Sequence, residues 1–78
     1  MEAILGSTIA LTCPLLGSSF QWQKLEKTYW SILQQGAKYG NAKTESLIIY
    51  NVDLSDAGNY LCTDGSQHSS MQVTVIGK

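Results

Sequence analysis

The sequence contains no arginine, one proline, one histidine and only two cysteines. Arginine is the side chain that most often binds phosphate groups and guanine edges. The five lysines are interspersed with six acidic residues, so no basic stripe replaces it. Nucleic acid is therefore not an expected partner. One histidine and two distant cysteines do not complete a four-ligand zinc site, and we expect neither a metal nor a cofactor.

Long apolar runs are also missing. No stretch approaches the ~20 apolar residues that cross a membrane, and "MEAILGSTIA" at the N-terminus lacks the charged and apolar regions of a signal peptide. We expect membrane attachment only through segments absent from this chain. With 78 residues and 44% hydrophobic content, the sequence predicts a single small domain over residues 1–78.

The two cysteines, Cys13 and Cys62, lie too far apart in the sequence for a CxxC redox pair. A domain of this size buries only roughly 60% of its unfolded surface and gains much from a cross-link. An even cysteine count in a small chain indicates one disulfide and an oxidising compartment. The alternative is two buried free thiols in an intracellular protein.

Short runs of alternating apolar and polar residues dominate the chain. "STIALTC", "FQWQK", "SLIIYNV", "NYLCTD" and "MQVTVIGK" alternate, and turn residues such as those of "PLLGSS" and Gly40–Asn41 separate the runs. "DLSDAG" is typical of a turn or a single helical turn, and "GSQHSS" of a loop. This pattern predicts an all-β sandwich or barrel of antiparallel strands.

A family resemblance rests on Cys13, Trp22 and the segment "SLIIYNVDLSDAGNYLC". A cysteine on one strand, a tryptophan on the next, and a tyrosine two residues before a second cysteine resemble the immunoglobulin superfamily. The segment matches the family pattern at every marked position: Leu47, Ile49, Val52, Asp56, Gly58, Tyr60 and Cys62. With 48 residues between the cysteines, the resemblance favours an intermediate or second-constant type, and the C′ region keeps a truncated variable-like topology open.

The resemblance implies an immunoglobulin-like Greek-key sandwich of two antiparallel sheets. Its expected strands are A′ (about 2–5), B (7–14), C (20–24), C′ (29–33), a short D near 42–45, E (46–51), F (59–64) and G (70–77).

The same resemblance assigns structural roles to four residues and a bridge. Trp22 is expected to pack against a Cys13–Cys62 bridge, and Tyr60 to donate its hydroxyl to backbone in the E–F turn. Gly58 lets this turn close, and Asp56 caps its free N–H groups. Lys43 or Lys38 is expected to pair with Asp56.

Asp64, Ser66, His68, Ser69 and Ser70 fall together in the expected F–G loop. Their residue types allow a hydrolytic triad, but a triad needs a rigid scaffold, oxyanion donors and a pocket. A short hairpin loop supplies none of these, so we do not expect an enzyme. In this fold a polar F–G loop is a recognition loop or a solvated turn.

The candidate partner-binding residues lie on the expected G-F-C-C′ sheet and its F–G loop. Tyr29 and Trp30 are large side chains on strand C′, where exposed aromatics serve as interface anchors, although they also suit the sheet edge and the rim of the core. Leu61 is expected to point outward from the same sheet and to share a face with Tyr29 and Trp30, which suggests a covered face. The full candidate set is Tyr29, Trp30, Leu61, Gln23, Thr74, Gln67 and His68.

The resemblance therefore implies an extracellular or cell-surface recognition module of an immune or cell-adhesion receptor. Its partner would be another protein: a receptor, a ligand, a neighbouring immunoglobulin-like domain, or a second subunit in a homo- or heterodimer. "STIALTCP" and "YLCTDGSQHSSMQVTV" are somewhat similar to the invariant signalling chains of the T-cell receptor complex. The alternative is a structural spacer domain of an intracellular muscle or cytoskeletal protein, with reduced cysteines.

Overall fold

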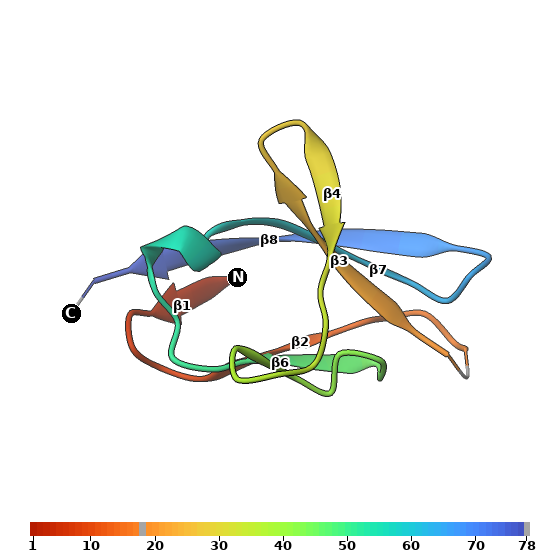
Figure 1. Ribbon diagram of the computed structural model, residues 1–78, viewed down its shortest axis with the longest axis horizontal. Coiled ribbons are helices and arrows are strands. Elements are labelled where there is room, and N and C mark those ends of the chain that lie inside the picture. Colours follow the sequence, from red (N-terminus) through yellow and green to blue (C-terminus); the bar gives the residue numbers. More distant parts are fainter. Residues whose placement is uncertain (18, 78) are drawn as a thin grey trace.

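Two β-sheets packed face to face make up the computed structural model, which describes residues 1–17 and 19–77. One sheet has the strand order β1-β8-β7-β3-β4 and the other β2-β6-β5, and Figure 1 shows the two layers. The strands are β1 (Glu2–Ile4), β2 (Ile9–Thr12), β3 (Gln21–Glu26), β4 (Tyr29–Ile32), β5 (Tyr39–Gly40), β6 (Ser46–Ile49), β7 (Gly58–Thr63) and β8 (His68–Ile76). This arrangement confirms the predicted immunoglobulin-like sandwich.

Among the described residues, all strand pairs but one are antiparallel. The exception is β1, which runs parallel to β8 with Glu2 opposite Thr74. A single 3-10 turn, η1 (Leu54–Asp56), connects β6 to β7, as the "DLSDAG" segment predicts. In the described residues no helix is long and apolar enough to cross a membrane.

Two predicted strand positions are wrong. The short strand expected near 42–45 lies earlier, at β5, where Tyr39 pairs with Ile49 of β6. Asn41 adopts a left-handed φ of 53° and its carbonyl accepts the Thr44 N–H, so the chain turns back over 41–45 instead of running straight. The last strand begins at His68 and not at residue 70, because pairing with β7 extends the ladder into polar residues. The end of the expected range 70–77 reaches beyond β8, and Lys78 of the domain predicted over 1–78 lies outside the described residues, as does Ser18.

The hairpin of β3 and β4 is longer than predicted. The segments "QKLEK" and "YWSILQQ" have no convincing helix caps, and both contribute to strands and not to helices. Glu26 stands opposite Tyr29 across a turn at Lys27–Thr28. In Figure 1 this hairpin stands away from the sheet that carries β2 and β6. Its outer half therefore projects into solvent, with Tyr29 60% exposed.

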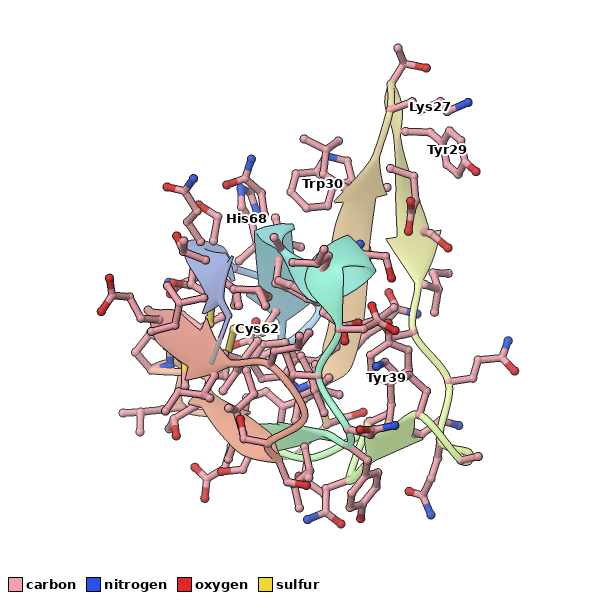
Figure 2. All side chains as sticks on the ribbon, turned by 90° about the vertical axis from the view of Figure 1, so that its left-hand side faces the viewer. Lys27, Tyr29, Trp30, Tyr39, Cys62 and His68 are labelled. Carbon is pink, nitrogen blue, oxygen red and sulfur yellow. A yellow bond between two sulfur atoms is a disulfide. The ribbon has the colours of Figure 1, made fainter. Side chains whose placement is uncertain are left out.

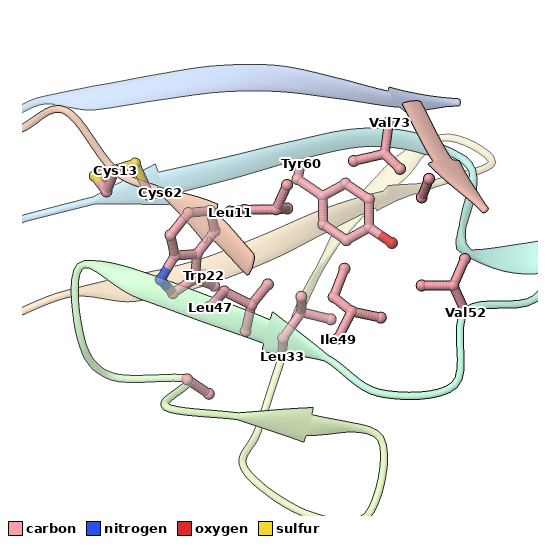
Figure 3. Packing of buried hydrophobic residues seen from close by; sticks show 12 residues of the cluster. Leu11, Cys13, Trp22, Leu33, Leu47, Ile49, Val52, Tyr60, Cys62 and Val73 are labelled. Carbon is pink, nitrogen blue, oxygen red and sulfur yellow. A yellow bond between two sulfur atoms is a disulfide. The ribbon is translucent and has the colours of Figure 1, made fainter. Parts of the chain in front are cut away.

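The core lies between the sheets around Trp22 and the bridge of Cys13 to Cys62 (Figure 3). Trp22 is fully buried, stands opposite Cys62 in the sheet, and donates its indole N–H to the Thr44 carbonyl at 2.8 Å. The bridge joins β7 of one sheet to the end of β2 in the other. It closes a 49-residue separation, which the chain-entropy model values at about 4 kcal/mol.

The turn between β6 and β7 is fixed by Tyr60 and Asp56. Tyr60 is fully buried and donates its hydroxyl to the Asp56 carbonyl at 2.6 Å. The Asp56 carboxylate accepts the Asp53 N–H at 2.9 Å and pairs with Lys38 at 2.5 Å, so Lys38 and not Lys43 is the basic partner. Gly58 has φ 144°, a conformation that side-chain-bearing residues rarely adopt.

Burial raises the pKa values of Tyr60 and Tyr39 at this corner. It raises the pKa of Tyr60 far above its ordinary value, and negative charge on Tyr39 and Asp56 adds to the effect. The pKa of Tyr39 is raised too, mainly by burial and then by the Asp56 carboxylate. The corner is therefore built for neutral phenols.

Candidate functional site

The surface of the five-stranded sheet that faces away from the core is called the outer face here. Because side chains alternate along a strand, its members are the residues between the buried positions Trp22, Tyr60, Cys62 and Val73. They are Gln21, Gln23 and Leu25 of β3; Trp30 and Ile32 of β4; Asn59, Leu61 and Thr63 of β7; His68, Ser70, Gln72, Thr74 and Ile76 of β8; and Glu2 and Ile4 of β1.

The outer face carries almost no charge. Glu2, on the edge strand β1, is its one acidic residue, and no lysine belongs to it. His68 is its one further titratable group. Its other polar side chains are glutamine, asparagine, serine and threonine. Elsewhere on the molecule lysines and acids pair, as Lys38 does with Asp53 and Asp56.

Four apolar side chains from neighbouring strands lie on this face, and we call them the apolar patch: Leu25, Trp30, Ile32 and Leu61. Leu25 stands opposite Trp30, while Gln23 stands between Ile32 on one side and Leu61 on the other. Trp30 is 41% exposed and Ile32 54% exposed, whereas Leu25 and Leu61 are half-buried. Uncharged polar residues surround the patch on β7 and β8.

Tyr29 does not join this patch, which corrects the expectation that it shares a face with Trp30 and Leu61. Consecutive residues of a strand point to opposite sides, and Tyr29 stands opposite Glu26 on the other side of the hairpin. In Figure 2, Trp30 points toward the side where His68 lies, and Tyr29 points away from it.

The other predicted partner-binding residues divide between the patch and its surroundings. Gln23 lies within the patch and donates its amide to Gln21 at 3.1 Å. Thr74 is on the outer face but far from β4, beside β1. Gln67 belongs to the turn between β7 and β8, and His68 is exposed at the first position of β8, opposite Thr63.

Hydrogen bonds to the Asp64 carboxylate stabilise the β7–β8 turn, residues 64–67. The Asp64 carboxylate accepts the N–H groups of Gln67 at 2.8 Å and Ser66 at 2.9 Å. These backbone hydrogen bonds lower the pKa of Asp64, the Gln67 bond most strongly. Asp64 thus stabilises the turn through an Asx-type contact, and its carboxylate is occupied by backbone.

The residues considered for a hydrolytic triad are divided between the β7–β8 turn and the two faces of β8. His68 and Ser70 point to the outer face, whereas Ser69 points to the inner side of the same strand. Among the described residues no group of three or more histidine, cysteine, aspartate or glutamate side chains is placed to hold a metal ion.

A half-open groove of about 870 Å³ lies at the end of the sandwich near the β7–β8 turn. Its walls include Gln21 at the start of β3 with Phe20 just before it, Ile32 at the end of β4 with Leu33 just after it, and Asp64. Ile32 belongs to both the groove and the apolar patch. The turn and the outer face are therefore parts of one continuous surface.

Three residues of this region were missed by reasoning from the sequence. Leu25 and Ile32 could have been found by extending the alternation through Trp22 and Trp30. The buried Lys24 carried no such signal: its ammonium donates to the Ser55 carbonyl at 2.6 Å, a contact between strand β3 and η1 that only the fold creates.

A family model of the immunoglobulin I-set domain matches residues 1–76. Similar solved structures include the N-terminal four immunoglobulin domains of Dscam1 isoform 8.4, at 21% identity and TM-score 0.83, covering 100% of this chain and 22% of that one. A structure on Dscam isoform specificity has 25% identity and TM-score 0.73, covering 99% of this chain and 21% of the other. This chain thus spans about a fifth of the Dscam chains it matches.

Another similar structure contains the extracellular domains of the voltage-gated sodium channel beta4 subunit. It has 18% identity and TM-score 0.77, and it covers 100% of this chain and 90% of that chain. The parallel homodimers of that subunit's extracellular domains explain its role in cell–cell adhesion.

Proposed function

The chain belongs to the immunoglobulin I-set family, and we propose that it is an extracellular protein-recognition module of a cell-adhesion or immune receptor. In this proposal a protein partner binds the outer face, centred on the apolar patch, with the β7–β8 turn at its rim. Leu61, Trp30 and Gln23 are proposed as central contacts, and His68, Gln67 and Thr74 as peripheral ones. The proposal assigns Tyr29 no place in this contact surface.

One observation supports this choice of face above all: the outer face combines the apolar patch, which extends from β7 to the β4 edge, with a near absence of charge. Depletion of charged residues is a mark of the central region of protein interfaces, where aromatic side chains are enriched. Burying glutamine, serine and threonine against a partner costs little when they exchange hydrogen bonds with it, whereas burying lysine or glutamate costs more. Trp30 supplies the type of side chain that most often dominates binding energy.

The similar proteins support the extracellular assignment. The beta4 subunit structure is one of extracellular domains, and a bridge such as Cys13–Cys62 persists in oxidising compartments. The beta4 subunit has a role in cell–cell adhesion, and another similar structure is that of the Down Syndrome Cell Adhesion Molecule. Both favour a protein partner over a small molecule. The narrower likeness to T-cell receptor signalling chains stays a prediction.

A binding screen tests the proposal. The chain, tetramerised through a C-terminal tag to raise avidity, is incubated with a panel of purified ectodomains of other cell-surface proteins. Each captured ectodomain is then measured against Leu61→Asp and Ile48→Asp. These two residues form a matched pair, because each is half-buried and apolar, and Ile48 lies on the corresponding surface of the three-stranded sheet.

We expect Leu61→Asp to abolish capture and Ile48→Asp to preserve it, with both variants retaining the native bridge and cooperative unfolding. Capture that is lost with Ile48→Asp and kept with Leu61→Asp would refute the choice of face. A complete absence of captured ectodomains would count against the recognition function itself.

A further inference from the structure

The free edge of β4 has open backbone hydrogen-bonding groups. In an antiparallel pair, residues alternate between those bonded to the partner strand and those whose N–H and C=O point away. The Leu33 N–H donates to the Trp22 carbonyl at 2.9 Å. Because bonded residues alternate, Ser31 and Tyr29 are the residues of β4 whose backbone groups bond to β3. Trp30 and Ile32 therefore direct their backbone groups to the open edge.

Nothing in the sequence protects this edge from pairing. Proteins usually block exposed edge strands with charged side chains, proline or bulges. Residues 28–37 contain no charged residue and no proline, and β4 pairs with β3 without a bulge over its whole length. The hairpin also stands clear of the second sheet (Figure 1), so a further strand can approach it.

Other strand edges of the sandwich lack this combination. β5 is only two residues long, and β1 carries Glu2. On β2, the Cys13 N–H donates to the Glu45 carbonyl, so the alternate residues Cys13, Leu11 and Ile9 bond toward β6. Ala10 and Thr12 therefore have open backbone groups, but their side chains are small. β4 has two large exposed apolar residues with open backbone groups, Trp30 and Ile32. β1 has one such side chain, Ile4, and the Ile4 carbonyl already accepts the Ser7 N–H.

We propose that a second copy of this chain pairs with β4 edge to edge in the antiparallel direction. Two-fold symmetry then places Ser31 of one copy opposite Ser31 of the other. This register uses only strand residues for hydrogen bonding, since Trp30 of each copy exchanges both backbone bonds with Ile32 of the other. A register centred on Trp30 or on Ile32 would need Thr28 or Gln34, which lie outside β4.

The occupant is a second copy because this edge is complementary to itself. Antiparallel pairing centred on Ser31 sets Trp30 against Ile32 of the other copy twice, an aromatic and β-branched pair on the outer face. It opposes no like charges, because Lys27 stands opposite Gln35 of the other copy. Such an isologous contact closes after two copies and joins two five-stranded sheets into one.

This contact involves few residues, so the dimer is expected to be weak and to dissociate on dilution. It does not depend on the proposed binding of another protein through the outer face, because the backbone edge of β4 carries it. Leu61 lies on β7, away from that edge, so Leu61→Asp should leave the dimer intact.

Cysteine cross-linking tests the register. Ser31→Cys places two thiols on Cα atoms about 4.5 Å apart at a non-hydrogen-bonded pair, within disulfide range. Thr28→Cys is the matched control on the same hairpin: its two copies lie six residues apart along the strand direction, roughly 20 Å. In a glutathione buffer we expect a covalent dimer from Ser31→Cys and none from Thr28→Cys, with the native bridge verified by peptide mapping.

Sedimentation equilibrium of the unmodified chain gives an independent measurement. We expect its average mass to rise with concentration, Ile32→Pro to remain monomeric and Ile32→Val to associate like the parent. Proline at 32 removes only an N–H that points away from β3, so the hairpin is retained. A chain that stays monomeric at the highest concentration, equal cross-linking of both cysteine variants, or full association of Ile32→Pro would each overturn the proposal.

Discussion

Removing the Tyr60 hydroxyl should destabilise the protein through a single atom. Tyr60 is fully buried, and its hydroxyl donates to the Asp56 carbonyl at 2.6 Å. Tyr60→Phe keeps the ring in the core and deprives this carbonyl of its donor. A buried acceptor left without a partner costs about 1–3 kcal/mol. For a domain of this size each kcal/mol lowers Tm by roughly 4–8 °C.

The pH dependence of stability supplies a second signature of the same hydroxyl. In the unfolded chain a tyrosine ionises near pH ~10, whereas burial holds the pKa of folded Tyr60 far higher. The stability that the neutral Tyr60 hydroxyl contributes to the folded state is therefore complete below about pH 10 and is lost as the pH rises above that value. Tyr60→Phe should show a shallower alkaline decline, with Tyr39 accounting for part of what remains.

Urea unfolding, followed by tryptophan fluorescence between pH 7 and 11, measures both effects. Tyr50→Phe is the control, because Tyr50 is 40% exposed, and we expect its urea midpoint at pH 7 to match the parent. If Tyr60→Phe unfolds at the parent's midpoint, or if both variants fall equally, the hydroxyl does not hold the corner.

Three further predictions concern the same scaffold. Asp53→Ala should lower the urea midpoint more than Asp53→Asn, because Asp53 caps η1. The Ser55 hydrogen bond lowers the pKa of Asp53. The stability that the Asp53 carboxylate contributes should therefore be lost as the pH falls below ~4. Lys38→Met should cost about 1–2 kcal/mol in urea unfolding by unpairing the buried Asp56, discounted for the exposure of Lys38, whereas exposed Lys43→Met should cost little. Reducing the inter-sheet bridge should cost ~4 kcal/mol, and finding two free thiols by mass spectrometry in oxidised material would contradict an extracellular assignment.

The sequence was informative where a strand's two faces differ. Alternation through Ile9 and Leu11, or through Met71, Val73 and Val75, identified the inward residues, since each of them packs in or against the core. The spacing of tryptophan, tyrosine and cysteines then identified the family. Both signals are local or depend on fixed spacings, so neither needs knowledge of the tertiary contacts.

The predicted strand positions were wrong where pairing with a distant strand determines the local structure. Tyr39 forms a strand because Ile49 of β6 lies opposite it. These two residues are ten positions apart in the sequence, so no local pattern predicts their pairing. His68 and Ser69 have loop-like character but complete the ladder with β7. At the candidate site, Trp30 lies on the outer face with Leu61, whereas Tyr29 lies on the other side of the hairpin because side chains alternate along β4. The binding roles of Trp30 and Leu61 stay predictions.

Mapping a bound partner on the chain tests the proposed recognition face most directly. An ectodomain captured in the screen is titrated into the isotopically labelled chain, and amide chemical shifts are followed by NMR. We expect the changes to concentrate on β3, β4 and β7 around Leu61 and Trp30, and to spare β2 and β6. Changes centred on β2, β5 and β6, with the amides around Leu61 unmoved, would contradict recognition through the outer face.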